Sequence, residues 1–117
     1  DELGFDEAYM ERGFSTFTLE DSIRYLKEFR LNDVVYPSFQ LYKANKKLLH
    51  FIGILQNKDN EVAAIFETVL GHIDLNKRKI VNFSDQMIEN LLKVSSEQRK
   101  ISGLPFEVKL HIKDIDE

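Results

Sequence analysis

The sequence has no cysteine among its 117 residues. Disulfide bonds, thiolate nucleophiles and cysteine-ligated metal sites are therefore excluded. A chain without disulfides suits a reducing compartment, so we expect a cytoplasmic protein.

A long apolar run and an excess of positive charge are also missing. No segment approaches the length of a membrane span, and the opening DELGFDEAYM lacks the basic and apolar regions of a signal peptide. The formal net charge of −4 gives no electrostatic case for nucleic acid binding. We expect neither a membrane nor a nucleic acid partner, although basic residues within 43–47 and 77–79 leave room for a small anionic ligand.

Motifs of catalysis and metal binding are absent as well. The sequence has no glycine-rich phosphate loop, no nucleophile elbow and no pair of histidines at metal-binding spacing. We therefore expect no cofactor and no metal. No sequence motif identifies a catalytic residue either. The three histidines, His50, His72 and His111, lie far apart in the sequence, and a structural role is the first expectation for each.

The composition that remains is that of a folded domain. Hydrophobic residues make up 43% of the chain and charged residues 31%, with nine Phe and four Tyr. Such a chain folds instead of remaining disordered, and its length is that of one domain, residues 1–117. It also begins without Met, so we expect either a processed chain or a piece of a longer one.

Five segments have clear patterns. Apolar and β-branched residues are frequent in three segments separated by short turns, residues 34–44, 47–57 and 61–74. This pattern predicts an antiparallel meander, and Pro37 is expected at an edge or a bulge. Ser84 as an N-cap, followed by the apolar stripe Met87, Ile88, Leu91 and Leu92, predicts a helix. After Gly103 and Pro105, the alternation in FEVKLHIK predicts a further strand, or a tail, within 104–117.

The stretch FTLEDSIRYLKEFRLND, residues 17–33, fits two structures. Thr18 with Asp21 can cap a helix, whereas the alternation around Leu19 and Ile23 fits a strand that only Asp21 interrupts. The neighbouring meander favours the strand, joined to residues 34–44 by the turn RLND. Asp21 is then expected to turn outward at a bulge or a sheet edge.

Two residues stand out for their chemistry. His72 lies in LGHID at the end of a buried strand beside Gly71, where it either approaches a ligand or hydrogen-bonds a carbonyl at the sheet end. Glu67 shares its phase with Ile65 and Val69, so it is either solvated or satisfied by a partner, or else buried with a raised pKa suited to acid–base chemistry.

Three stretches of the chain carry a family resemblance, in this order: FTLEDSIRYLKEFRLND, KKLLHF and VLGHIDLNKRKI. With them the chain resembles the acyl-coenzyme A thioesterases of the hotdog fold. The nearest group is the 4-hydroxybenzoyl-CoA thioesterase-like branch that includes thioesterases of carnitine and betaine metabolism. The resemblance covers about residues 4–92 and implies an α+β hotdog fold, an antiparallel sheet with a helix. The first strand and most of the central helix of that fold have no counterpart here. Residues 16–29 would be the long second strand, whose edge pairs with its copy in a homodimer or tetramer.

The resemblance also implies a function, hydrolysis of an acyl-CoA thioester by water at a dimer interface. Glu20, Arg24, His50 and His72 agree with the family pattern. The substrate-binding candidates are Arg24, His50 and His72 and, from its place in an apolar strand, Glu67. The family's catalytic acid belongs to the part without a counterpart, so the catalytic residues are unknown. The alternative is a non-catalytic hotdog module that binds a ligand or a partner. Ser22 and Gly53 stand where relatives often have His.

Overall fold

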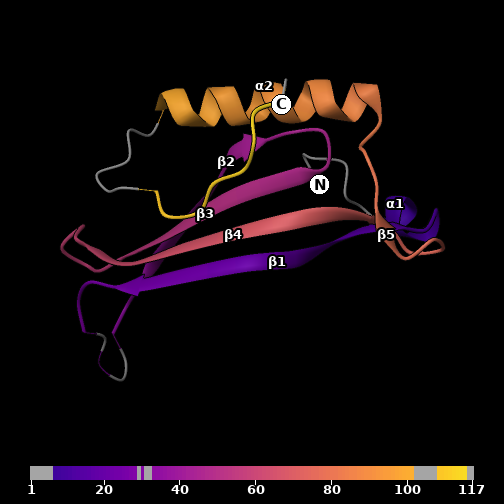
Figure 1. Ribbon diagram of the computed structural model, residues 1–117. Helices are drawn as coiled ribbons and strands as arrows, with labels where there is room; N and C mark the ends of the chain where they lie inside the picture. Colours follow the sequence, from indigo (N-terminus) through magenta and orange to yellow (C-terminus); the bar gives the residue numbers. More distant parts are fainter. Residues whose placement is uncertain (1–6, 29, 31–32, 102–107, 116–117) are drawn as a thin grey trace.

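The computed structural model describes residues 7–28, 30, 33–101 and 108–115. No helix among these residues is long and apolar enough to cross a membrane. Figure 1 shows the elements along the chain: α1 (Glu7–Glu11), β1 (Phe14–Tyr25), β2 (Tyr36–Ala44), β3 (Leu48–Gln56), β4 (Val62–Asp74), β5 (Lys79–Ile80) and α2 (Asp85–Ile101).

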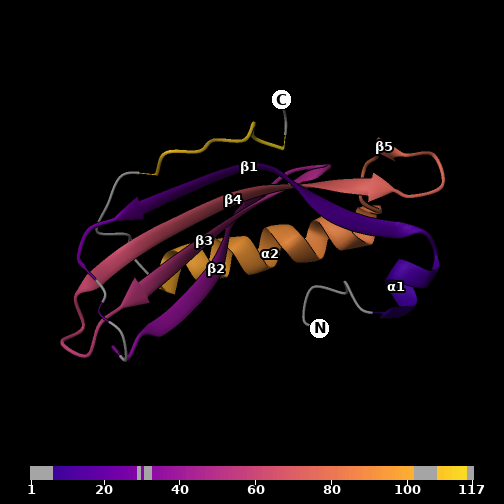
Figure 2. The same ribbon diagram turned by 90° about the horizontal axis from the view of Figure 1, so that it is seen from below.

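The strands form one antiparallel sheet in the order β1-β4-β3-β2, with the short β5 paired to β4 (Figure 2). The expected meander of β2, β3 and β4 is confirmed, and Pro37 lies on the edge strand β2, where a missing N–H is tolerated. The expectation that the first strand continues the meander beside β2 is wrong. β1 instead crosses to the far side of the sheet and pairs with β4 over almost its whole length.

The ambiguous stretch is a strand in the structure. β1 ends at Tyr25, and its register against β4 shifts between Thr18 and Glu20, which marks a bulge at Leu19. Asp21 is exposed just after this bulge, as expected. The last part of the predicted segment includes residues 29, 31 and 32, which lie outside the described part of the chain.

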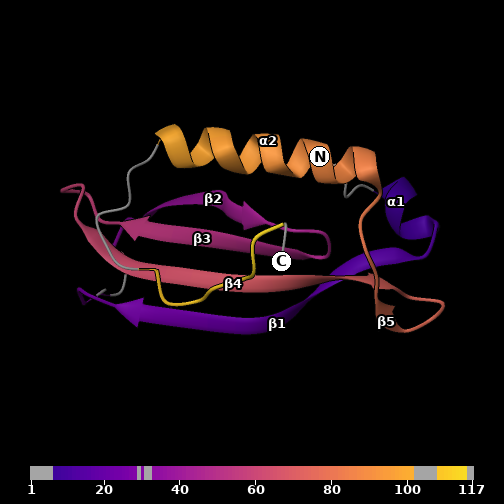
Figure 3. The same ribbon diagram turned by 45° about the horizontal axis from the view of Figure 1, so that its top comes forward.

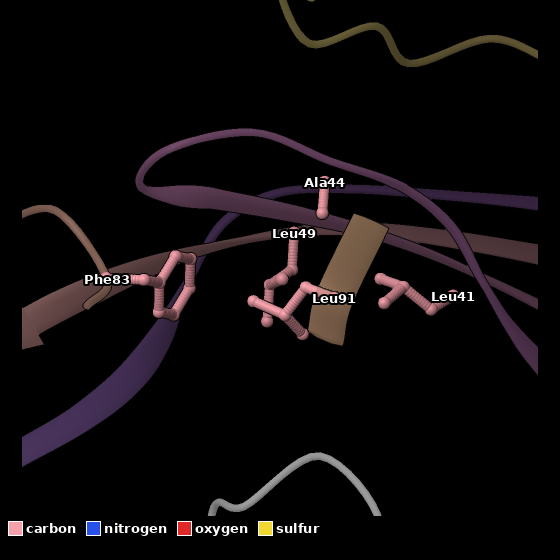
Figure 4. Packing of buried hydrophobic residues seen from close by; sticks show 5 residues of the cluster. All are labelled: Leu41, Ala44, Leu49, Phe83 and Leu91. Carbon is pink, nitrogen blue, oxygen red and sulfur yellow. The ribbon is translucent and has the colours of Figure 1, made fainter. Parts of the chain in front are cut away.

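Helix α2 packs against the edge strand β2, and its side chains form a buried hydrophobic cluster with residues of β2 and β3 (Figure 1). Ser84 caps the helix as predicted, because its Oγ accepts a hydrogen bond from the N–H of Met87 at 3.2 Å. Three of the four predicted stripe residues face the strands, with Leu91 fully buried and Met87 and Ile88 packed beside it, while Leu92 is half-buried outside this cluster. Figure 4 shows the buried cluster between helix and sheet: Leu41, Ala44, Leu49, Phe83 and Leu91.

The C-terminal segment, residues 108–115, lies against the sheet but is not part of it. The strand expected over 106–113 is not present in 108–113, which has no regular secondary structure, while 106 and 107 lie outside the described residues. Figure 3 shows the segment, in yellow, running across β4 and β3. The main-chain N–H groups of Lys109 and Leu110 bond to the side chain of Glu67 in β4 instead of to a strand backbone, which explains why the alternating pattern did not produce a strand here.

Candidate functional site

Glu67, in the middle of β4, is the centre of a buried polar cluster. Its neighbours in sequence alternate between the two faces of the sheet, and Glu67 lies on the face opposite Leu49 and Leu70, which belong to the cluster around α2. Its exposed fraction is 0%. An ionised carboxylate at such a position must be paired and hydrogen-bonded, since its burial alone is costly.

Four donors satisfy the Glu67 carboxylate. Arg24 Nη2 and His50 Nε2 each lie 3.1 Å from one of its oxygens. The main-chain N–H groups of Lys109 and Leu110 lie at 2.9 and 3.0 Å. The cluster therefore joins β1, β3, β4 and the C-terminal segment through one side chain.

Strand register explains why these side chains meet. Ser22 of β1 and Ile52 of β3 lie directly opposite Glu67 on either side. Arg24 and His50 are each two residues along from those positions, so they are diagonal neighbours of Glu67 on the same face. Long side chains reach each other across such diagonals.

The surroundings of Glu67 favour its charged form. Burial by itself raises the pKa of this carboxyl, but the hydrogen bonds from Leu110, Lys109 and His50 reverse the effect and hold the pKa below its usual value. The sequence had suggested a raised pKa as one of two possibilities, and the structure favours the partner-satisfied one. Glu67 is therefore an ionised acceptor at neutral pH.

His50 is the second member of the cluster, and only 1% of it is exposed. Burial lowers the pKa of its imidazole, and the hydrogen bond to Glu67 only partly offsets this, so the ring is neutral at pH 7. Because an ionised carboxylate only accepts, Nε2 carries the proton and donates it to Glu67. Among the described residues none hydrogen-bonds to the other nitrogen, Nδ1, while Tyr42 packs edge-on against the ring.

A pocket of about 340 Å³ adjoins His50. Its walls come from β2, β3 and the C-terminal segment, which two further contacts hold in place. The Lys43 ammonium pairs with Asp114, and Asn45 Nδ2 donates to the carbonyl of Lys113 at 3.1 Å. The described residues that line the pocket are Tyr42, Lys43, His50, Leu110, His111, Ile112 and Asp114.

His72 is not part of this cluster. It lies near the end of β4 on the other face, where its Nδ1 donates to the Val81 carbonyl at 3.0 Å and its Nε2 accepts from the Tyr9 hydroxyl. Phe14 and Phe83 stack on the ring, with centroids 5.4 and 4.2 Å away. Both ring nitrogens are thus used within the fold, as in the carbonyl-bonding alternative that the sequence suggested.

The structure thus brings Arg24, His50 and Glu67 together and leaves His72 apart. Sequence reasoning missed the two N–H donors of the C-terminal segment and the contact of Tyr42 with His50. Backbone donors from a segment more than 40 residues away leave no signal in a sequence pattern. In the described part of the chain, no group of His, Asp and Glu side chains is arranged to hold a metal ion.

Comparison with known proteins extends these observations. A family model described as the Thioesterase-like superfamily matches residues 1–91. The L-carnitine dehydrogenase/betainyl-CoA thioesterase of Rhizobium meliloti is 29% identical over 102 residues, which are 86% of this chain but 21% of that protein. The chain therefore spans about a fifth of the length of this curated relative.

Two solved structures from Staphylococcus aureus share the fold. One is a hypothetical protein in complex with CoA, with a TM-score of 0.73 and 22% identity over 89% of this chain and 66% of the other. The second is the DHNA-CoA thioesterase, with a TM-score of 0.71 and 20% identity over 88% of this chain and 72% of the other. The antiparallel sheet with its helix is a hotdog fold, and the chain belongs to the thioesterase-like superfamily.

Proposed function

We propose that this chain is an acyl-CoA thioester hydrolase, or the thioesterase part of a longer one. The observation that carries the proposal is the match of the thioesterase-like family over residues 1–91, the same segment that holds the buried His50–Glu67 pair. A relative named for betainyl-CoA hydrolysis and a similar fold solved with CoA support the choice of a CoA ester. Thioester hydrolysis needs a group that accepts a proton from water, and a neutral imidazole does so at pH 7.

The proposed assembly is a homodimer or a tetramer in the cytoplasm. β1 lies at an edge of the sheet and pairs only with β4 among the described strands. An unpaired edge of this length is a hazard unless another strand or a charged surface covers it. Pairing with β1 of a second copy is the solution that we propose.

A non-catalytic ligand-binding module is the second candidate. It is favoured by one observation: all four donors to Glu67 come from the protein itself, as in a cluster that only holds the fold together. In this case the His50 pocket would bind a CoA ester without cleaving it.

Thiol release from CoA esters distinguishes the two functions. Acetyl-CoA, betainyl-CoA and benzoyl-CoA are incubated with the protein and free thiol is followed with a chromogenic disulfide. Because the chain has no cysteine, the protein adds no thiol to the signal. Turnover above the buffer rate supports the hydrolase, whereas calorimetric binding without turnover supports the binding module.

A further inference from the structure

We propose that His50, held by Glu67, activates the hydrolytic water inside the pocket beneath the C-terminal segment. The inference rests on the proposed function and adds a catalytic residue, His50, and a positioning residue, Glu67, to it. Sequence reasoning left the catalytic residues unknown, and no motif indicates this pair.

The geometry is that of an oriented general base. Glu67 Oε1 lies 3.1 Å from His50 Nε2 and fixes the proton on that nitrogen. The lone pair of the neutral imidazole is then on Nδ1, to which none of the described residues donates a hydrogen bond. A carboxylate that orients an imidazole, whose second nitrogen is free to take a proton, is the arrangement used for nucleophile activation.

The charges around His50 keep it neutral. Lys43 from β2 and His111 from the C-terminal segment oppose a positive charge on the ring, and Glu67 from β4 favours one. Arg24 pairs with Glu67, and Asp114 pairs with Lys43. Burial outweighs the carboxylate, so the ring is an unprotonated base at pH 7.

The reaction balances with water as the only co-reactant. His50 Nδ1 takes a proton from water as the water oxygen bonds to the thioester carbonyl carbon. When the tetrahedral intermediate collapses, the carbon–sulfur bond breaks and the sulfur leaves with the electron pair. The imidazolium returns its proton to the thiolate, which yields a carboxylic acid, a free thiol and neutral His50.

The pocket suits the acyl end of such a substrate. A volume of about 340 Å³ is at the lower end of small-molecule sites. Leu110 and Ile112 contribute apolar side chains to its lining, and the Lys43 ammonium, paired with Asp114, adds a charged group. Glu67 also anchors the segment that supplies these wall residues, so one carboxylate positions both the base and the wall.

The test compares steady-state thiol release by the wild-type protein, His50→Gln and Glu67→Gln. His50→Gln keeps an amide near Glu67 but removes the base, and we expect kcat to fall 100-fold or more. Glu67→Gln should lower kcat and move the acid limb of the pH profile to lower pH, because the carboxylate raises the pKa of His50. Glu61→Gln is the matched control, since Glu61 is exposed and pairs with Lys27 away from the pocket.

The outcomes separate this inference from the proposed function. No turnover by the wild-type protein would overturn both. If the wild-type protein turns over and folded His50→Gln has a kcat within tenfold of it, the role of His50 alone would be overturned. If that variant does not fold, the wild-type profile decides: kcat/KM should fall on acidification as the pH drops through the lowered pKa of His50, and a profile without any acid limb down to the pH at which the protein unfolds would contradict the proposal.

Discussion

At the scale of single residues, Glu67 determines what this face of the sheet can do. Its position among Ile65 and Val69 marked it in the sequence as an acid in an apolar strand. Its partners could not be predicted, because the sequence does not specify that β1 lies beside β4. Once β1 and β3 flank β4, register alone brings Arg24 and His50 to the carboxylate.

Replacing Glu67 with alanine should destabilise the protein strongly. The change leaves the buried His50 Nε2, the partly buried Arg24 guanidinium and two partly buried main-chain N–H groups without their acceptor. A donor left without its acceptor costs about 1–3 kcal/mol, so the loss of four such bonds should amount to several kcal/mol. Urea unfolding of Glu67→Ala and of the exposed control Glu61→Ala measures this. A loss below about 1 kcal/mol for Glu67→Ala, equal to that of the control, would mean that the cluster is not stabilising.

Acidification should weaken the fold in two stages. Burial lowers the pKa of both His50 and His72, so between the lowered values and the usual 6.5 the unfolded chain binds protons that the folded chain does not. Stability is therefore full above about pH 7 and falls as the pH drops through 6.5. Glu67, with its pKa below the usual 4.5, contributes stability above that pH, which is lost as the pH falls through the lowered value.

The free energy of urea unfolding between pH 8 and pH 4 tests this dependence. His72→Asn should flatten the fall near pH 6 by removing one of its two sources. A free energy that is constant from pH 8 to pH 5 would contradict the neutral state of both buried histidines.

At the scale of elements, local sequence patterns predicted which segments are helices or strands, whereas pairing between distant segments decided where each strand lies in the sheet. The meander and the Ser84 cap followed from turns and capping chemistry, which are encoded within a few residues. The place of β1 did not follow, because a strand pattern does not name its partner. The alternation of residues 106–113 did not produce a strand in 108–113, since the main chain there bonds to a carboxylate instead.

Deleting residues 108–117 should destabilise the domain and open the His50 pocket. The Glu67 carboxylate would lose two N–H donors, and each lost hydrogen bond to a charged group costs about 1–3 kcal/mol. We expect a clearly lower melting temperature and a CoA-ester KM that rises as the wall is lost. Melting and KM values equal to those of the intact chain would show that the segment contributes to neither.

The helix face gives an independent check on the core. Leu91 is fully buried between α2 and the strands beside Leu41 and Leu49 (Figure 4). Leu91→Ala should cost about 2–5 kcal/mol in urea unfolding. The exposed Lys93→Ala on the same helix should change stability by less than about 0.5 kcal/mol. Equal effects from the two substitutions would contradict the packing of α2 on the sheet.

At the scale of the whole molecule, the exposed apolar side chains of β1 indicate where a second copy would pack. Ile23 and Phe17 are 51% and 44% exposed on this edge strand. If residues 16–29 pair with a second copy, Ile23→Lys should shift the protein toward monomer in light scattering at tens of micromolar. Met10→Lys, equally exposed on α1, should not. A wild-type protein that is monomeric at this concentration would contradict the dimer.

Nuclear magnetic resonance of the His50 ring shows its protonation state and its contact with a substrate analogue. With ¹⁵N-labelled histidine, and His50→Gln to assign the signal, we expect a neutral ring at pH 7 with the proton on Nε2. A non-hydrolysable CoA thioether should then shift the Nδ1 resonance. A proton on Nδ1, a charged ring at pH 7, or an Nδ1 resonance that saturating thioether leaves unchanged would show that His50 is not the base.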